Sequence, residues 1–326
     1  MRRCVVTDYT FANVAAERAA AFENGATFEA HRTVPAGDVA RLVRDADVAV
    51  VQDAPVDAEA IAALAPGATV LRYGSDVDTI DIEAAHAAGV KVGYAPDYCV
   101  EEMAEHTVAS LLTLLRKLPG LDRSVRSGAW DAVAVARPIR PFAETTVGFF
   151  GFGRIGRAVW GKLRGLGFSA IVADPALGPV EANAHGVDRA EAATVFAEAD
   201  AVTLHAAVTE DTAGYVNADR LASMRSHAVI VNTAAGALVV EEDLAAALYA
   251  GTIAGAALDS FVKEPLPVGS PLLQAANCLI TPNAAWYSDT AIARLQAMVA
   301  EDIGRALNGE PPRCPVRFVN NEETAS

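Results

Sequence analysis

The chain has 326 residues, of which 52% are hydrophobic and 21% are charged, and its formal net charge is −15. This length predicts about two domains with room for sizeable cores, and the composition is that of a globular protein. The acidic balance makes nucleic acid and anionic membranes unfavourable partners, because both would be repelled by the surface.

The amino terminus, MRRCVVTDYT, runs from two arginines directly into a strand-like segment and lacks the features of a signal peptide. No apolar run approaches the ~20 residues needed to span a bilayer, so we expect a soluble, cytoplasmic protein. The four cysteines are far apart and form no ligand pairs, which favours reduced thiols and predicts no metal site. They are Cys4, Cys99, Cys278 and Cys314.

The first part of the chain alternates short apolar segments with alanine-rich segments, which predicts a small α/β domain with a parallel sheet covered on both faces. The predicted strands are Cys4–Thr7, Val48–Gln52, Val70–Tyr73 and Lys91–Tyr94. The predicted helices are Ala12–Glu23, Ala36–Asp45, Asp57–Leu64 and Ile82–Ala88.

A long helix is predicted next, because apolar residues recur at helical spacing from Val100 to Leu118. It should end near Pro119 and Gly120, since both residues break helices. The segment Leu121–Ala143 is then expected to be an irregular arm. So long a connection in a compact domain is usually functional or contacts a partner.

The stretch Thr145–Asp174 combines a strand, a glycine turn, a helix and a second strand. The apolar run Val147–Phe150 suits a buried parallel strand. In the following GFGRIG, Gly151 can take the tight turn, Gly153 leaves room for a pyrophosphate, and Gly156 lets the helix sit close to the sheet. This pattern predicts a dinucleotide site.

The predicted helix begins at Arg154 and Ile155, where free N–H groups can point at phosphates. Its apolar face is formed by Ile155, Val159, Leu163 and Leu166. The second strand ends in Asp174, 18 residues beyond Gly156, where an acidic residue would bond the adenosine ribose. A carboxylate there would repel a 2′-phosphate, so the predicted cofactor is NAD rather than NADP. The alternative, a tight turn without a ligand, is disfavoured by the combination of strand, spacing, helix and acidic residue.

The rest of the chain predicts a doubly wound nucleotide-binding domain of about six or seven strands. Further strands are expected at Ala170–Ala173, Ala201–Leu204, Ala228–Val231, Ala256–Leu258 and Cys278–Ile280, and further helices at Glu191–Glu198, Ala218–Met224, Glu241–Ala250 and Ser288–Leu307. Ligands of such sheets bind beyond the carboxyl ends of the strands, so the residues after each strand are the candidate site residues.

Seven ordered motifs resemble those of the D-isomer-specific 2-hydroxyacid dehydrogenases, and the C-terminal-binding-protein branch is the nearest. They are RYGSDVDTID, PDYCVEEMAEHT, GFGRIG, LHAAVTEDTAGYVN, NTAAGALVVEEDL, GAALDSFVKEPLP and TPNAAWYS. The resemblance implies two doubly wound parallel-sheet domains, with an NAD-binding Rossmann domain (98–287) inserted in a smaller flavodoxin-like substrate domain (1–97 and 288–326). It also implies a homodimer, joined through the nucleotide domain and the arm, and a small-molecule substrate.

The resemblance also implies a catalytic set from which this chain departs. In the family an Arg inside NTARG binds the substrate, and a Glu polarises the acid/base His inside TPH. This chain has Glu264, but Ala235 stands at the Arg position and Asn283 at the His position. In a loop whose N–H groups hold the substrate carboxylate, Asp76 follows Ser75 where the family usually has Gly.

These departures predict poor reduction of ordinary 2-keto acids. Alanine cannot replace a bidentate guanidinium contact, and a neutral amide does not usefully exchange a proton near neutral pH. Loss of a general acid typically costs ~10²- to 10⁴-fold in rate. If Asp76 points into the cleft, a neutral or cationic substrate is preferred to an anionic one.

Three functions stay open. The first is an NAD-dependent oxidoreductase acting on another substrate, such as an imine or a specialised metabolite. The second is a non-catalytic NAD(H)-sensing protein, and the third uses NAD without net redox. In an oxidoreductase of this kind, the proton would be donated or accepted by Glu264, Asp76, Tyr98, Tyr287 or water. Glu264 could instead be a solvated remnant, and Asp76 an outward-facing turn residue.

Further site residues follow from the resemblance. Trp286 matches a Trp that packs against substrate, although an aromatic residue there is also common in cores. His205 is expected to line the dinucleotide site rather than to catalyse, and His106 to be structural or interdomain. The implied substrate residues are Ser75, Asp76, Tyr98, Ala235 and Trp286. The other implied cofactor positions are Thr212, Thr233, Ala234, Asp259 and Asn283, with Asp259 near the nicotinamide carboxamide.

Overall fold

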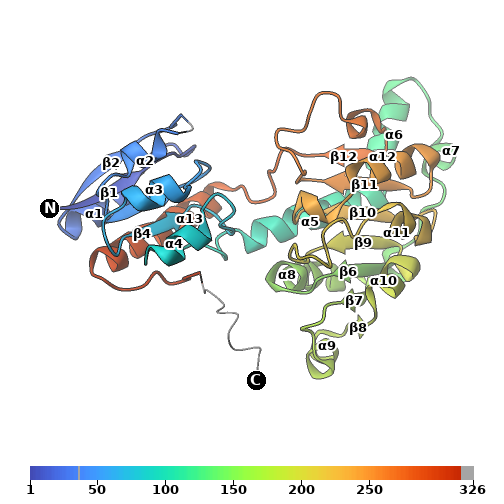
Figure 1. Cartoon of the computed structure of the whole chain (residues 1–326). Helices are drawn as coiled ribbons and strands as arrows, with labels where there is room; N and C mark the ends of the chain where they lie inside the picture. The colour runs from blue at the N-terminus through green and yellow to red at the C-terminus, as the bar shows by residue number, and fades with distance from the viewer. Residues whose placement is uncertain (36, 317–326) are drawn as a thin grey trace. The chain divides into compact units, whose positions relative to one another are not determined.

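The computed structural model describes residues 1–35 and 37–316. Residue 36, the first of one predicted helix, and residues 317–326, the end of the predicted substrate domain, lie outside the described part. The chain forms two compact units, one of Met1–Cys99 with the segment from Tyr287 onward, the other of Val100–Trp286. Each contains one parallel sheet, so the predicted α/β fold with two parallel-sheet domains is confirmed (Figure 1). Among the described helices, none has both the length and the apolar character required to cross a membrane.

The first unit is a five-stranded sheet of order β2-β1-β3-β4-β5, the flavodoxin-like order. Its strands are β1 (Arg2–Val6), β2 (Ala26–Ala30), β3 (Val48–Val51), β4 (Thr69–Arg72) and β5 (Lys91–Gly93). Its helices are α1 (Ala15–Glu23), α2 (Val39–Leu42), α3 (Ala58–Ala63), α4 (Ile82–Ala87) and α13 (Asp289–Leu307). Val43 of the loop after α2 and Ile61 of α3 share a buried cluster with the sheet residue Val70. Helices α1 and α13 pack against each other, and α13 also contacts β3 and β4.

Strand β2 was not predicted from the sequence. It lies at the edge of the sheet, where it pairs with β1, and Ala26 is its one fully buried residue. An edge strand that is covered on one side needs no continuous apolar run, so the pattern that marks the central strands is absent here.

The second unit is a seven-stranded parallel sheet of order β12-β11-β10-β9-β6-β7-β8. Its strands are β6 (Thr146–Phe150), β7 (Ser169–Ala173), β8 (Asp188–Arg189), β9 (Ala201–Leu204), β10 (Val229–Asn232), β11 (Gly255–Leu258) and β12 (Cys278–Ile280). Its α-helices are α5 (Val100–Leu115), α6 (Leu118–Arg126), α7 (Ala132–Ala136), α8 (Arg154–Leu163), α9 (Pro179–His185), α10 (Ala192–Glu198), α11 (Ala218–Ser223) and α12 (Glu241–Ala250). Short 3-10 turns are η1 (Phe142–Glu144), η2 (Arg164–Leu166), η3 (Gly236–Leu238) and η4 (Pro271–Gln274).

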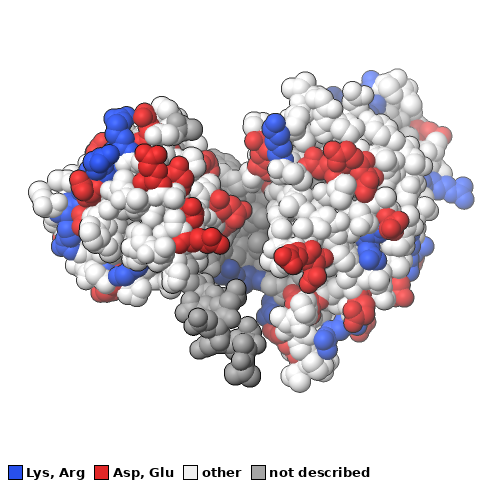
Figure 2. Space-filling view, in the orientation of Figure 1, with Lys and Arg blue, Asp and Glu red and all other residues white. Residues whose placement is uncertain are grey.

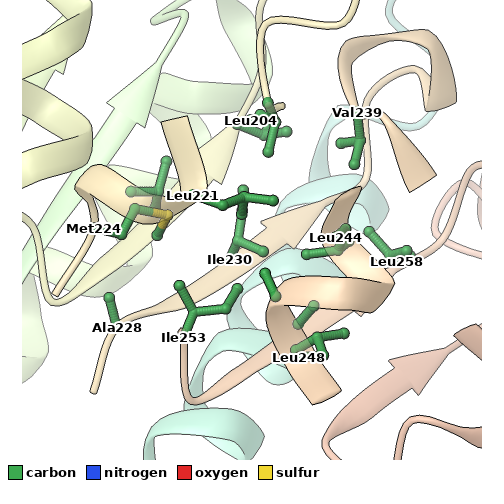
Figure 3. Close-up of a cluster of buried hydrophobic side chains, with 14 of the residues drawn as sticks. Leu204, Leu221, Met224, Ala228, Ile230, Val239, Leu244, Leu248, Ile253 and Leu258 are labelled. Carbon is green, nitrogen blue, oxygen red and sulfur yellow. The ribbon is translucent and has the colours of Figure 1, made fainter. Parts of the chain in front are cut away.

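Strand β10 shows how this sheet is covered on both faces. Because successive side chains of a strand point to opposite faces, Ile230 packs with α11 and α12, whereas Val229 and Val231 pack with α5 and α8. Figure 3 shows the first of these clusters, in which sheet and helix side chains meet. It includes Leu204, Leu221, Met224, Ile230, Val239, Leu244, Leu248 and Leu258. Burial on both faces explains why these strands read as apolar runs in the sequence.

The predicted end of the long helix and the irregular arm need correction. Helix α5 does end before Pro119, but α6 starts at Leu118 and contains both Pro119 and Gly120, because proline is tolerated in the first turn of a helix. The arm therefore contains most of α6 and all of α7, and it is irregular at residues 127–131 and 137–141. Its apolar residues Trp130 and Val133 are 88% and 69% exposed, and the homodimer contact through the arm stays a prediction.

One member of the predicted apolar face of α8 is also corrected. Leu166 lies beyond the end of α8, in η2, and is 46% exposed. Val159 and Leu163 are buried as expected. The helical spacing continues in the sequence beyond Leu163, where α8 ends, up to Gly167, whose φ of 92° turns the chain toward β7.

Candidate functional site

The ends of β6 and β9 form the point where the strand order reverses, which is where doubly wound sheets bind ligands. Gly151 follows β6 with φ 92°, a conformation that side chains disfavour. A Cβ atom at Gly151 would lie 2.4 Å from the backbone nitrogen of Ala206, in the loop after β9. The two loops therefore approach through backbone atoms, and this approach requires glycine.

Helix α8 starts directly above this turn. A Cβ atom at Gly156, which is buried, would lie 3.0 Å from the carbonyl oxygen of Gly151, so the helix is packed closely on the turn. Gly153 caps the helix, is exposed, and has no atom within 4 Å of the position of a Cβ. The first N–H groups of α8 belong to exposed Arg154 and half-buried Ile155. This arrangement fits the phosphates of a dinucleotide.

Asp174, at the end of β7, is bonded to the glycine turn. Its Oδ2 accepts a hydrogen bond from the N–H of Phe152 at 2.6 Å, and its Oδ1 accepts one from the N–H of Ala176 at 2.8 Å. The carboxylate is therefore held in one orientation beside the turn. That position suits the predicted contact with the adenosine ribose.

His205 and Thr212 lie in the loop after β9. Burial lowers the pKa of His205 to about 3, and its Nε2 lies 3.0 Å from the hydroxyl of Thr203. The ring is neutral near pH 7, which is consistent with lining the site rather than donating a proton. The Thr212 hydroxyl donates to the carbonyl oxygen of Ala207 at 2.7 Å and accepts from the N–H of Thr209 at 2.8 Å, so it closes this loop.

The loop after β10 is held by the buried side chain of Asn232. Its Nδ2 donates to the carbonyl oxygen of Ala235 at 2.9 Å, and its Oδ1 accepts from the N–H of Ala234 at 3.0 Å. The hydroxyl of Thr233 is buried and lies 2.7 Å from that of Thr107 on α5. Thr233 can therefore reach a ligand only through its backbone. Ala235 is half-buried against the core and presents no charge.

A chain of hydrogen bonds joins α5 to the ends of β11 and β12. Buried Asp259 accepts from the Thr281 hydroxyl at 2.6 Å and from the N–H groups of Ala284 and Ala285 at 2.9 Å. The Thr281 hydroxyl has one proton, which it donates to Asp259. Its oxygen therefore accepts a hydrogen bond from His106 Nε2 at 3.1 Å. In this network the Nε2 atom of His106 carries a proton. Thr281 was not singled out from the sequence, because its partner on α5 is 175 residues away.

Asn283 and Glu264 are brought together after β12 and β11. The Asn283 Nδ2 donates to Glu264 Oε2 at 2.9 Å, and Glu264 Oε1 accepts from the N–H of Phe261 at 3.0 Å. Both side chains belong to exposed residues. A Cβ at Gly236 would lie 2.1 Å from the carbonyl carbon of Phe261, so the loop bearing Ala235 packs directly on the loop bearing Glu264.

In the first unit, Ser75 and Asp76 lie exposed in the loop after β4. Asp76 Oδ1 is 3.6 Å from Nη2 of buried Arg72, and Asp53 Oδ1 is 3.7 Å from the same nitrogen. Burial raises the pKa of Asp53; the Arg72 guanidinium opposes this shift, and the Asp8 and Asp76 carboxylates add to it. The sequence singled out Asp76 alone, because Asp8 and Asp53 follow other strands.

The aromatic candidates are placed less favourably for proton transfer. Tyr98 is 6% exposed, and its pKa is raised by burial and then by Cys99; Arg294 donates to its carbonyl oxygen. Tyr287 donates to Asp289 at 3.1 Å, and this hydrogen bond raises its pKa. Trp286 is half-buried, which is compatible both with contact to a substrate and with packing in a core.

Comparisons with known proteins identify the family of the chain. The family model "D-isomer specific 2-hydroxyacid dehydrogenase, NAD binding domain" matches residues 108–285. The D-3-phosphoglycerate dehydrogenase of Mycobacterium tuberculosis is 35% identical over 269 residues, which cover 82% of this chain and 50% of that protein. The chain thus spans about half the length of the curated relatives it matches.

Two solved structures share the fold over 97% of this chain and all of theirs. The TT0316 protein of Thermus thermophilus has a TM-score of 0.85 at 30% identity. A D-isomer specific 2-hydroxyacid dehydrogenase of Lactobacillus delbrueckii, complexed with NAD, has a TM-score of 0.79 at 23% identity. The predicted cofactor, NAD, is confirmed by the matched NAD-binding domain. The chain belongs to the D-isomer specific 2-hydroxyacid dehydrogenases, a family of NAD-dependent oxidoreductases.

Proposed function

We propose that this protein is an NAD(H)-dependent oxidoreductase whose substrate is not a simple 2-keto acid. The observation that carries the proposal is the Asn283–Glu264 pair, in which a neutral amide donates to the carboxylate at 2.9 Å. The resemblance expects an imidazole in place of this amide, and a guanidinium in place of Ala235. Bound NAD supplies the hydride acceptor, and NADH the donor. The chain's own residues must then bind the substrate and move the proton.

The charges of the first unit support a neutral or cationic substrate. Arg72 is shared by Asp53 and Asp76, which lie 3.7 and 3.6 Å from its Nη2. Asp8 lies close enough to Asp53 to raise its pKa further. A guanidinium already neutralised by two carboxylates attracts an incoming carboxylate weakly. An aldehyde, ketone or imine without a carboxylate, or with a cationic group, suits these residues better.

Glu264 is the proposed proton donor and acceptor. It keeps a titratable carboxyl group at the position where the amide of Asn283 cannot exchange a proton usefully. One of its oxygens accepts from Phe261 and the other from Asn283, which orients the group. Its exposure to solvent allows its proton to be replaced after each turnover.

The proposal is tested by mixing the purified protein with NADH and a panel of aldehydes, ketones, imines and 2-keto acids while following nicotinamide absorbance. We expect NADH consumption with neutral or cationic carbonyl or imine compounds and little with simple 2-keto acids. Binding of NADH without consumption across the panel would favour a sensor. Product formation without net consumption would favour transient redox. Either result would overturn the proposal.

Replacing Glu264 by glutamine is expected to lower turnover of the substrate found in that panel by at least ~10²-fold, because glutamine cannot exchange the proton. Its amide oxygen can still accept from the N–H of Phe261, so the loop should persist. The matched control is Glu241→Gln, because Glu241 Oε1 accepts from the neighbouring Val262 N–H at 2.8 Å. Single-turnover NADH oxidation measures both variants. Unchanged turnover in Glu264→Gln would remove this residue from the mechanism.

Asp174→Asn is expected to shift cofactor preference toward NADPH by about tenfold or more, because it removes the charge that repels a 2′-phosphate. The amide oxygen can still accept from Phe152, whereas Asp174→Ala also removes this acceptor. The alanine variant should therefore weaken binding of both cofactors by about tenfold. Fluorescence titrations with NADH and NADPH measure these changes. An unaltered NADPH-to-NADH ratio in Asp174→Asn would show that the carboxylate does not discriminate.

A further inference from the structure

A second cluster of charged side chains lies at the opposite edge of the seven-stranded sheet, at the amino-terminal ends of β6, β9 and β10. Its centre is Asp200, which directly precedes β9 and is 3% exposed. One of its oxygens accepts from the N–H of Thr146 at 2.9 Å, and the other from Arg225 Nη1 at 2.9 Å and His227 Nε2 at 2.7 Å. Arg140 Nη1 lies 3.7 Å from the same carboxylate.

A cavity of about 30 Å³ opens beside this carboxylate. The end of α5, the end of the arm and the starts of β9 and β10 surround it. Its charged lining residues are Lys117, Arg140, Asp200 and His227. This space exceeds the ~10–15 Å³ that one water molecule needs and is far too small for a whole nucleotide, so it can receive one small group.

Basic groups outnumber acidic ones here, against the balance of the whole chain. The chain has 26 Lys and Arg against 41 Asp and Glu, and Figure 2 shows acidic side chains gathered in patches on the surface. Lys117 and Arg140 line the cavity and Arg225 is bonded to Asp200, so three cationic side chains accompany one carboxylate. Burial opposes ionisation of Asp200, but the Thr146 N–H and the two basic side chains bonded to it keep its pKa below the ordinary value. The cluster is therefore cationic even with His227 neutral.

Lys117 is the member whose charge is least compensated. Its Nζ donates to the carbonyl oxygen of Arg137 at 3.2 Å, and no carboxylate of the described residues lies within ion-pair distance. Burial lowers its pKa, as expected for an ammonium removed from water. Its backbone has φ 52°, which is uncommon for a residue other than glycine, and this conformation separates α5 from α6.

We propose that this cavity binds one phosphate group, either as free phosphate or as part of a small phosphorylated metabolite. A phosphate carries a charge of about −1.5 to −2 near neutral pH, which matches the excess of positive charge. The planar guanidinium of Arg140 and the ammonium of Lys117 are suited to phosphate oxygens. A bound group would join the arm, through Arg140, to the end of α5, through Lys117.

This site is separate from the NAD site. The two lie at opposite ends of β9, a strand of four residues, Ala201–Leu204. At ~3.3 Å per residue the two edges of the sheet are about 13 Å apart there, which is too far for one phosphate to contact both. Phosphate binding and NADH binding can therefore be measured independently.

The test is a calorimetric titration of the whole protein with inorganic phosphate at constant ionic strength set with sodium chloride. We expect saturable binding that weakens at least ~10-fold in Arg140→Gln and in Lys117→Gln, because each loses a charge-assisted contact. Arg126→Gln is the matched control, since Arg126 is 78% exposed on α6 and pairs with Asp122. Phosphate binding should be unchanged in it.

Two further measurements keep the outcome unambiguous. NADH binding should be unchanged in all three variants, which reports that the second unit is folded. If Lys117→Gln loses NADH binding, its fold is perturbed, and the phosphate affinity of Arg140→Gln, a change at an exposed residue, tests the proposal by itself. Tighter binding of glycerol phosphate than of inorganic phosphate would identify a phosphorylated metabolite, and equal binding would identify free phosphate. Absence of saturable binding, or equal affinity in Arg140→Gln and Arg126→Gln, would overturn the proposal.

Discussion

Replacing Gly151 by alanine is expected to abolish NADH binding and to destabilise the second unit by at least about 3 kcal/mol. The added Cβ would lie 2.4 Å from the nitrogen of Ala206 and 2.5 Å from the carbonyl carbon of His205, and both are backbone atoms. The φ of 92° would be strained as well. Relief requires the loops after β6 and β9 to separate, and these loops form the predicted cofactor site.

The matched control for this change is Gly161→Ala on the same helix, α8. No atom lies within 4 Å of a Cβ there, and alanine favours a helix over glycine by about 1 kcal/mol. This variant should bind NADH normally and unfold at the same or a slightly higher temperature. Thermal unfolding and NADH fluorescence titration measure both variants. NADH binding by Gly151→Ala at the affinity of the unmodified protein would contradict the assignment of this turn.

Introducing the two groups that the resemblance implies, with Asn283→His and Ala235→Arg together, is expected to raise the rate of 2-keto acid reduction by ~10²- to 10⁴-fold. Histidine tolerates the left-handed backbone of Asn283, at φ 50°, better than most residues. Asn283 already reaches Glu264 at 2.9 Å, so the introduced imidazole would lie beside that carboxylate. The measurement is kcat/KM for pyruvate in the single and double variants.

The pH dependence of the double variant gives a second check. Reduction needs the protonated imidazole, and a neighbouring carboxylate raises an imidazole pKa above about 6.5. The rate should therefore be highest below this pKa and fall as the pH rises through it. Asn283→Gln combined with Ala235→Arg is the control, because it supplies the guanidinium without a titratable group. An equal gain in that control would show that proton transfer is not what limits keto acid reduction.

The strands and the glycine turn could be predicted because their signals are local. The central strand β9 is fully buried and mostly apolar, and the edge strand β12 is a short apolar run; the predicted bounds of both match the structure residue for residue. The edge strands β2 and β8 were missed because they lack such a run: β8 has two exposed residues and β2 has a single buried one. The arm was taken as irregular because Pro119 reads as a helix breaker, whereas in a first turn it is compatible with a helix.

The candidate site was predicted unevenly. The resemblance located Glu264 and Asn283, and the structure adds the hydrogen bond that joins them. It did not indicate that Asp53 competes with Asp76 for Arg72, or that His106 reaches Asp259 through Thr281. These contacts link residues that follow different strands, and no sequence period relates such residues.

The sequence by itself determined the segment from Gly151 to Asp174, because its turn, helix and acidic residue lie within one continuous β-α-β motif whose geometry is local. It also determined that position 283 is asparagine rather than histidine and that position 235 is alanine rather than arginine. Only the tertiary structure decided that Asp200 gathers Arg140, Arg225 and His227 around a cavity with Lys117. Parallel strands place residues that are distant in sequence side by side at one edge of a sheet, and the charge of such an edge is known only when the strand order is known.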